Sequence, residues 1–81
     1  MNLAAYYDAY WSQADDTFDL ERLDLIASRV NPGERVLEVD CGPGVLAHRM
    51  RERGALVVAT DLSSVAVARA NAKGIPTQQV D

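Results

Sequence analysis

The chain has 81 residues, 48% of them hydrophobic and 25% charged, with a formal net charge of −4 at pH 7, which predicts one small folded domain at most and argues against disorder. Acids and bases are intermixed without a basic run, which argues against nucleic acid or an anionic membrane as partner, and the single cysteine excludes an internal disulfide. No apolar run reaches membrane length and the first eleven residues lack a signal-peptide pattern, so we expect a cytoplasmic protein.

The leader of the chain is rich in aromatic residues. Four of the five aromatic residues fall at positions 6, 7, 10 and 11, at spacings that put a tyrosine on the same helical face as Tyr10 and Trp11. This pattern predicts a short amphipathic helix whose rings pack on the domain. A lid that closes over a ligand pocket is the alternative.

A second helix is predicted next. Residues 15–17, Asp-Asp-Thr, can cap it, apolar side chains from Leu23 to Val30 share one face, and residues 31–33, Asn-Pro-Gly, end it. We interpret the acids at positions 8, 15, 16, 19 and 24 as caps or solvated side chains. We therefore expect a helical leader over residues 1–31 and a separate α/β unit over residues 32–81.

The rest of the chain is organised around residues 36–44, Val-Leu-Glu-Val-Asp-Cys-Gly-Pro-Gly. The branched apolar residues predict a buried strand that carries one acid, Glu38, and the glycines predict a turn into a helix over residues 45–53. Glycine lets the main chain approach a ligand closely, and the start of a helix offers free N–H groups. A polar or anionic ligand suits such a loop.

Residues 55–60 form a second apolar run, with Asp61 at its end, and residues 65–73 predict a helix capped by Ser63 or Ser64. A short strand over residues 77–80 and then Asp81 complete a β-α-β-α-β pattern. Such an α/β unit has parallel strands, and ligands bind at their carboxyl ends. The glycine loop, Asp61 and Asp81 should converge there.

The motif of residues 36–44, with Ala-Thr-Asp at residues 59–61, resembles the front of a class I S-adenosylmethionine-dependent methyltransferase. The resemblance runs from about Tyr6 to the end, because the tyrosine-rich leader is similar to the N-terminal helices of methyltransferases that act on small molecules. It implies a Rossmann-like parallel sheet, here only its first three strands. It also implies S-adenosylmethionine as cofactor and a small-molecule methyl acceptor.

The resemblance assigns the methionine half of the cofactor to the first strand and its loop. Glu38 would support the loop and the methionine amino group, and the loop from Cys41 through Gly42 to Gly44 would run along the methionine and ribose. Asp40 stands where the family usually has glycine. Its side chain would either crowd the cofactor and repel its carboxylate or reach the ammonium group.

The resemblance assigns the nucleoside half to the later strand ends. Asp61 would bind the two ribose hydroxyls, since a carboxylate only accepts hydrogen bonds. Leu62 would pack on the adenine ring and Asp81 would face its amino group, with a weaker contribution from Tyr10. Structural alternatives remain: Glu38 would pair with an arginine such as Arg35, Asp61 would cap the following helix, and Asp81 would be free in solvent.

Two other functions fit parts of the sequence. Residues 42–47, Gly-Pro-Gly-Val-Leu-Ala, also satisfy the NAD-binding fingerprint, with Asp61 about twenty residues on. Glu38 and Asp40 argue against it, because their charge opposes a pyrophosphate. The chain is alternatively a truncated, non-catalytic fragment or interaction module.

The interaction-module hypothesis concerns the strand at residues 36–39. If only three strands of the family's larger sheet are present, this strand lacks its neighbour on one side and becomes an exposed apolar edge. Such an edge can pair with a second copy or with a partner chain. No catalytic acid or base stands out, because His48 reads as a surface residue and Cys41 as small filler. In the family, residues for the acceptor lie beyond this stretch, so we do not expect the 81 residues alone to be catalytically complete.

Overall fold

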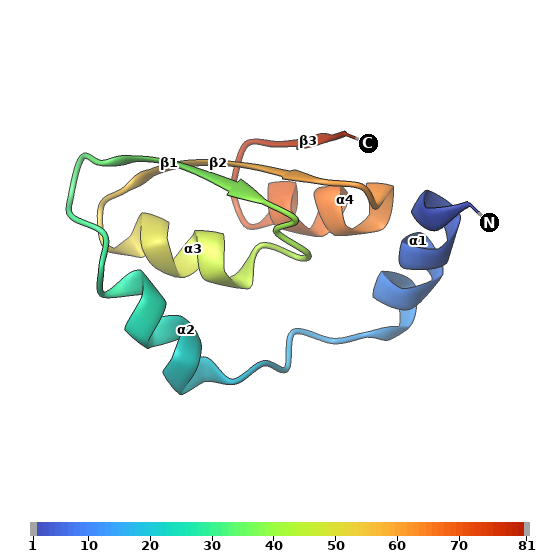
Figure 1. The fold of residues 1–81 in the computed structure, drawn as a ribbon, viewed down its shortest axis with the longest axis horizontal. Helices are drawn as coiled ribbons and strands as arrows, with labels where there is room; N and C mark the ends of the chain where they lie inside the picture. Colours follow the sequence, from blue (N-terminus) through green and yellow to red (C-terminus); the bar gives the residue numbers. More distant parts are fainter. Residues whose placement is uncertain (1, 81) are drawn as a thin grey trace.

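The computed structural model describes residues 2–80. No helix in that range is long and apolar enough to cross a membrane. The predicted order of two leading helices followed by β-α-β-α-β is confirmed (Figure 1). The elements are α1 (Leu3–Gln13), α2 (Leu20–Ala27), β1 (Arg35–Val39), α3 (Val45–Glu52), β2 (Leu56–Asp61), α4 (Ser64–Ala72) and β3 (Thr77–Gln79).

The strands form a parallel sheet in the order β1-β2-β3, with Leu37 beside Val58 and Thr60 beside Gln78, which confirms the predicted α/β fold. Consecutive crossovers in one direction place their helices on the same face of a sheet. Accordingly, α3 and α4 both lie beneath the strands, and α1 sits beside the N-terminal end of α4, at the end of β2 (Figure 1).

The core on the helical face is built from small side chains. Along β2, Val57, Ala59 and Asp61 are buried while the residues between them are more exposed, as a strand with one covered face requires. Alanines on the helices let them approach closely. At Gly44 (φ 83°) a Cβ atom would lie 2.9 Å from the Ala70 Cβ, so this turn requires glycine.

The predicted start and end of the second helix were wrong by a few residues. Asp19 is the N-cap of α2, and its Oδ1 accepts a hydrogen bond of 3.1 Å from the Arg22 N–H. Asp15 instead accepts from the Thr17 N–H, which forms a local turn before the helix. The helix ends at Ala27, so Val30 lies beyond it. Asp15, Asp16 and Asp19 could each cap α2 by sequence, but only Asp19 is followed three residues later by a residue of the helix.

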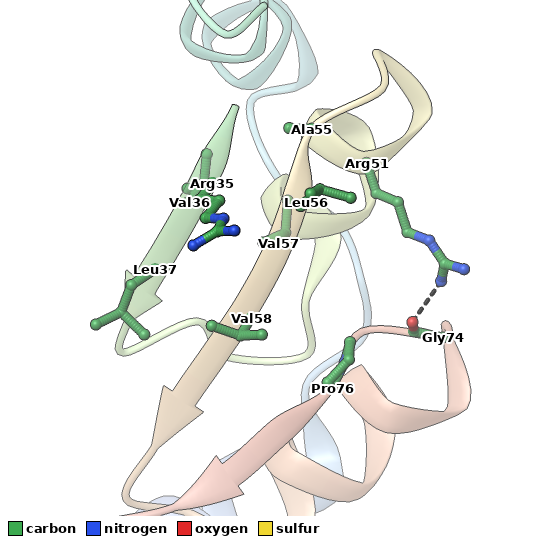
Figure 2. A pocket seen from close by; sticks show the side chains of 10 residues that line it. All are labelled: Arg35, Val36, Leu37, Arg51, Ala55, Leu56, Val57, Val58, Gly74 and Pro76. Atoms are coloured by element: carbon green, nitrogen blue, oxygen red, sulfur yellow. Dashed lines mark hydrogen bonds between the residues drawn. The ribbon is translucent and has the colours of Figure 1, made fainter. Parts of the chain in front are cut away.

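The face of the sheet opposite the helices is bare and apolar. Leu37, Leu56 and Val58 stand on it (Figure 2), and a hollow of about 550 Å³ lies among them. Arg35 and Arg51 border this hollow, and Arg51 Nη1 donates to the Gly74 carbonyl. β1 is an edge strand, as predicted from the sequence, but the prediction that it is buried was wrong: none of its residues is buried, because one face of the sheet is bare. Partner binding at this edge stays a prediction.

We expect the bare face to drive self-association, because burying exposed leucines removes apolar area from water. The 81-residue chain should show a mass above the monomer in light scattering after size exclusion. The double variant Leu37→Thr with Leu56→Thr should shift it toward monomer. Leu25→Gln is the control, because Leu25 on α2 is 61% exposed, like Leu56 at 61%. A wild type that stays monomeric at every concentration contradicts the prediction.

Candidate functional site

The glycine loop follows β1 and is held in left-handed backbone conformations. Asp40, Gly42 and Gly44 all have positive φ, and Asp40 (φ 58°) is the one non-glycine residue among 2–80 that does. Aspartate tolerates this conformation better than most side chains do, at some cost relative to glycine. The departure from the family pattern noticed in the sequence thus falls on a position whose backbone favours glycine. Residues 41–44 are all buried.

Asp61 connects the glycine loop to α4. Its side chain is buried, and its Oδ2 accepts from the Gly42 N–H at 2.8 Å while its Oδ1 accepts from the Ser63 N–H at 2.9 Å. A carboxylate has about four lone-pair sites, so capacity for two further donors remains. Asp61 is not the cap of α4. Ser63 is, accepting from the Ala66 N–H at 3.1 Å, as one of the two predicted caps.

Glu38 points to the same face of the sheet as Asp61, and among residues 2–80 it forms no ion pair. Burial, and then the charge of Asp61, raise the pKa of Glu38 to about 7. Within the described chain its Oε2 has no hydrogen-bond partner. The suggested pairing with Arg35 does not form, because residues three apart on a strand face opposite sides and Arg35 lies at the hollow on the bare face.

A pocket of about 300 Å³ lies at the carboxyl ends of β1 and β2, lined by Tyr7, Asp40, Asp61 and Leu62. The last three were singled out from the sequence. Tyr7 of α1 was not: it was grouped with the other leader aromatics, and only the docking of α1 distinguishes it. The pocket is at the lower end of the range of small-molecule sites, roughly 300–1,000 Å³.

Of the other predicted site residues, Glu38, Cys41, Gly42, Gly44 and Tyr10 do not line this pocket. Tyr10 lines a separate hollow with Tyr6 and Gln13, and its ring packs edge-on against Trp11. Asp81 lies outside the described residues. The site is therefore assembled from β1, its loop, β2 and α1.

Cys41 and His48, the other reactive side chains considered among the described residues, offer no nucleophile or base to the pocket. Burial, followed by the charges of Asp61 and Glu38, raises the pKa of the Cys41 thiol to about 12, so it stays protonated. His48 lies on α3 with its Nδ1 3.2 Å from Glu52 Oε1, a surface pair one turn apart. In the part of the chain that the structure describes, no three His, Cys, Asp or Glu side chains form a candidate metal site.

The pocket wall is acidic and therefore suits ligands that carry hydrogen-bond donors or positive charge. Asp40 and Asp61 contribute carboxylates to this wall. Glu38 is close enough to Asp61 that, after burial, the charge of Asp61 contributes to the raised pKa of Glu38. Hydroxyl and ammonium groups bind well to such a wall, whereas a phosphate is repelled. Leu62 and Tyr7 add apolar surface for a flat ring.

The chain matches known proteins in sequence and in fold. The model of the family described as "Methionine biosynthesis protein MetW" matches residues 20–81. The chain is 44% identical over 55 residues to the ubiquinone biosynthesis O-methyltransferase of Hahella chejuensis, and 54% identical over 43 residues to that of Xanthomonas campestris pv. campestris. It superposes with a TM-score of 0.75, at 22% identity, on a SAM-dependent methyltransferase from Thiobacillus denitrificans in complex with S-adenosyl-L-homocysteine.

These matches cover most of this chain and a small part of each relative. The Hahella match takes in 67% of this chain and 23% of the relative, and the Xanthomonas match takes in 52% and 18%. The solved structure is matched over 100% of this chain and 38% of its own. The chain therefore spans about a quarter or less of the length of the curated relatives it matches.

Glu38 should make the fold less stable as pH rises. Its pKa is about 7 in the folded chain against a reference of 4.5, so the folded state holds more protons between those values and the free energy of unfolding falls across that window. Glu38→Gln should lose this slope. In urea unfolding followed by circular dichroism at pH 5 and pH 8, the wild type should lose on the order of 1 kcal/mol more than the variant, allowing for solvent screening.

Glu21→Gln on the exposed side of α2 is the matched control and should keep the wild-type slope. Equal pH slopes for the wild type and Glu38→Gln would show that the Glu38 carboxyl does not carry the titration.

Proposed function

Because the chain belongs to the family of the methionine biosynthesis protein MetW, and with it to the class I S-adenosylmethionine-dependent methyltransferases, we propose that its glycine loop and strand ends bind S-adenosylmethionine for methyl transfer to a small molecule. The observation that carries the proposal is the acidic pocket of Tyr7, Asp40, Asp61 and Leu62 at the carboxyl ends of β1 and β2. Ligands of parallel α/β sheets bind at that edge.

The nucleoside half of the cofactor fits the β2 side of this pocket. Asp61 has two acceptor sites left after its bonds to the Gly42 and Ser63 N–H groups, which matches the two hydroxyls of a ribose. Leu62 and Tyr7 would pack on the adenine. Because Asp61 is fixed at both oxygens, it would accept from the ribose without rearranging, which lowers the entropic cost of binding.

The methionine half fits the β1 side. Its ammonium group is a cation, and Asp40 offers a carboxylate at the pocket wall. Within residues 2–80, one buried oxygen of Glu38 has no hydrogen-bond partner, so a cation there would relieve the burial penalty that raises its pKa. The backbone of residues 41–44 would line the path between these two halves.

In the proposed reaction the chain acts by positioning and by electrostatics. The cofactor supplies a methyl group on a sulfonium that is already a good leaving group. Asp61 fixes the Gly42 N–H, the acidic wall favours a cationic ligand, and α1 covers the pocket through Tyr7. Such alignment of two reactants lowers the barrier, and the proton that a hydroxyl or amine acceptor loses would go to solvent or to a base that the described residues do not supply. Cys41 and His48 have no part in it.

The acceptor class follows only coarsely from the relatives. The curated relatives are O-methyltransferases of ubiquinone biosynthesis, whereas the matching family model is described by methionine biosynthesis. Both descriptions concern small molecules, so we propose a small-molecule acceptor, and the acidic balance of the chain is consistent with that. The rest of the acceptor site would come from chain outside these residues.

A non-catalytic interaction module is the second candidate, and the bare sheet face supports it. Leu37, Leu56 and Val58 are exposed there beside the free edge of β1. A face of this kind binds a protein surface rather than a small polar ligand. The two functions occupy different sides of the sheet, so one ligand-binding experiment separates them.

The test is isothermal titration of S-adenosyl-L-homocysteine into the chain, with NAD alongside. We expect one binding event for the first ligand and none for NAD. Asp40→Asn should weaken binding about 3- to 10-fold, because asparagine tolerates the same left-handed backbone and loses only the charge. Asp19→Asn is the matched control, since asparagine caps α2 as well as aspartate does.

Absence of binding by a folded wild type would sink the cofactor proposal and leave the interaction module. Binding of NAD with equal affinity would favour the dinucleotide alternative. An Asp40→Asn variant that binds more tightly than the wild type would mean that Asp40 opposes the cofactor carboxylate instead of holding the ammonium group.

A further inference from the structure

α1 is attached to the rest of the molecule by polar contacts rather than by apolar burial. None of its residues is fully buried, yet it lies against α4 beside the end of β2 (Figure 1). A helix with so little buried apolar surface depends on specific anchors for its position. Two side chains provide them, one at each end of the contact: Asp8 on α1 and Arg69 on α4.

Asp8 binds the N-terminal end of α4. Its Oδ1 accepts from the Ser63 hydroxyl at 2.6 Å and from the Val65 N–H at 3.2 Å, and its Oδ2 accepts from the Ser64 hydroxyl at 2.9 Å. These hydrogen bonds, that of Ser63 first, hold the pKa of Asp8 below its usual value. A negative charge at this end of a helix is also favoured by the helix dipole. The sequence had suggested only a cap or solvated acid.

Arg69 binds the C-terminal end of α1. Its Nη1 donates to the carbonyl oxygens of Trp11 and Ala14, each at 2.8 Å, and so satisfies acceptors that the helix end leaves free. Its guanidinium carbon lies 5.8 Å from the centroid of the Trp11 ring, and its Nη2 pairs with Asp16. α1 is thus held to α4 at its middle, through Asp8, and at its C-terminal end, through Arg69.

A continuous series of contacts connects these anchors with the residues of the proposed cofactor pocket. The Trp11 ring packs on the glycine loop, where a Cβ on Gly42 would come within 2.9 Å of it. The Gly42 N–H donates to Asp61, Asp61 also accepts from the Ser63 N–H, and the Ser63 hydroxyl donates to Asp8. This series of contacts starts on α1 at Trp11 and ends on α1 at Asp8, which is next to the pocket-lining Tyr7 in the sequence.

We propose that Asp8 and Arg69 are positioning residues that dock α1 on α4 so that Tyr7 closes the pocket over Asp40 and Asp61, an inference that rests on the proposed cofactor site. Neither residue lines the pocket. They act through the placement of Tyr7. Docking and ligand binding are then coupled, and each favours the other by the same factor.

The chain carries its own reporter of docking, because Trp11 is its single tryptophan and packs on the glycine loop. Asp8→Ala should shift the Trp11 emission to the red and increase quenching by acrylamide. It should weaken S-adenosyl-L-homocysteine binding about 5- to 10-fold, within the usual range of such couplings. Saturating ligand should return the emission to the wild-type value, because binding selects the docked helix.

Two further variants separate docking from closure. Asp24→Ala is the matched control: it removes an aspartate that pairs with Arg49 between α2 and α3, and should leave both emission and affinity unchanged. Tyr7→Ala should keep the wild-type emission and still bind the ligand more weakly, because α1 remains docked without its closing ring. Arg69→Ala should behave like Asp8→Ala. Far-UV circular dichroism checks that each variant is folded, and Asp8→Asn replaces Asp8→Ala if it is not.

A red-shifted Asp8→Ala variant that binds the ligand as tightly as the wild type would overturn the inference, since α1 would then be only a packing helix. Wild-type emission in both Asp8→Ala and Arg69→Ala would overturn it as well, because the two anchors would not hold α1. If the wild type binds no S-adenosyl-L-homocysteine, the cofactor proposal fails and closure fails with it, while the emission still decides whether these residues dock α1.

Discussion

The carboxylate of Asp61 is the contact on which the other parts of the site depend. It ends β2, accepts from the Gly42 N–H of the loop after β1, and accepts from the Ser63 N–H at the start of α4. Removing it would leave two N–H groups without an acceptor in a buried place, at about 1–3 kcal/mol each. Because Gly42 contacts Trp11 and Ser63 contacts Asp8, the position of α1 also depends on this one carboxylate.

The site concentrates negative charge without neutralising it. The four ion pairs found among residues 2–80 involve His48, Arg49, Arg69 and Lys73, and none of them reaches Glu38, Asp40 or Asp61. Burial, and then the nearby charge of Asp61, raise the pKa of Glu38, so keeping this carboxyl ionised costs folding free energy. Proteins keep such arrangements chiefly where a ligand completes them. The left-handed Asp40 adds backbone strain at the same spot.

What could be predicted from the sequence was local, and what could not was set by packing between distant segments. The strands, the glycine loop and the convergence of that loop with Asp61 at the carboxyl ends of the strands follow from apolar runs and turn residues. The contacts of Asp8 with Ser63 span 55 positions and leave no local pattern. The choice of Tyr7 over Tyr10 at the pocket depends on the rotation of α1, which those contacts fix. Asp19 caps α2 although nearby acids looked equally suitable.

The alanine-rich core constrains how this sequence can drift. Ala47, Ala66 and Ala70 are fully enclosed within α3 and α4. A change to glycine would cost roughly 0.5–1 kcal/mol of helix stability, and a larger side chain would overpack the contact at roughly 1–3 kcal/mol. At these three alanines, a smaller residue and a larger residue are therefore both destabilising. At Leu37 and Leu56, which are 63% and 61% exposed on the bare face, the packing of the core constrains the side chain far less.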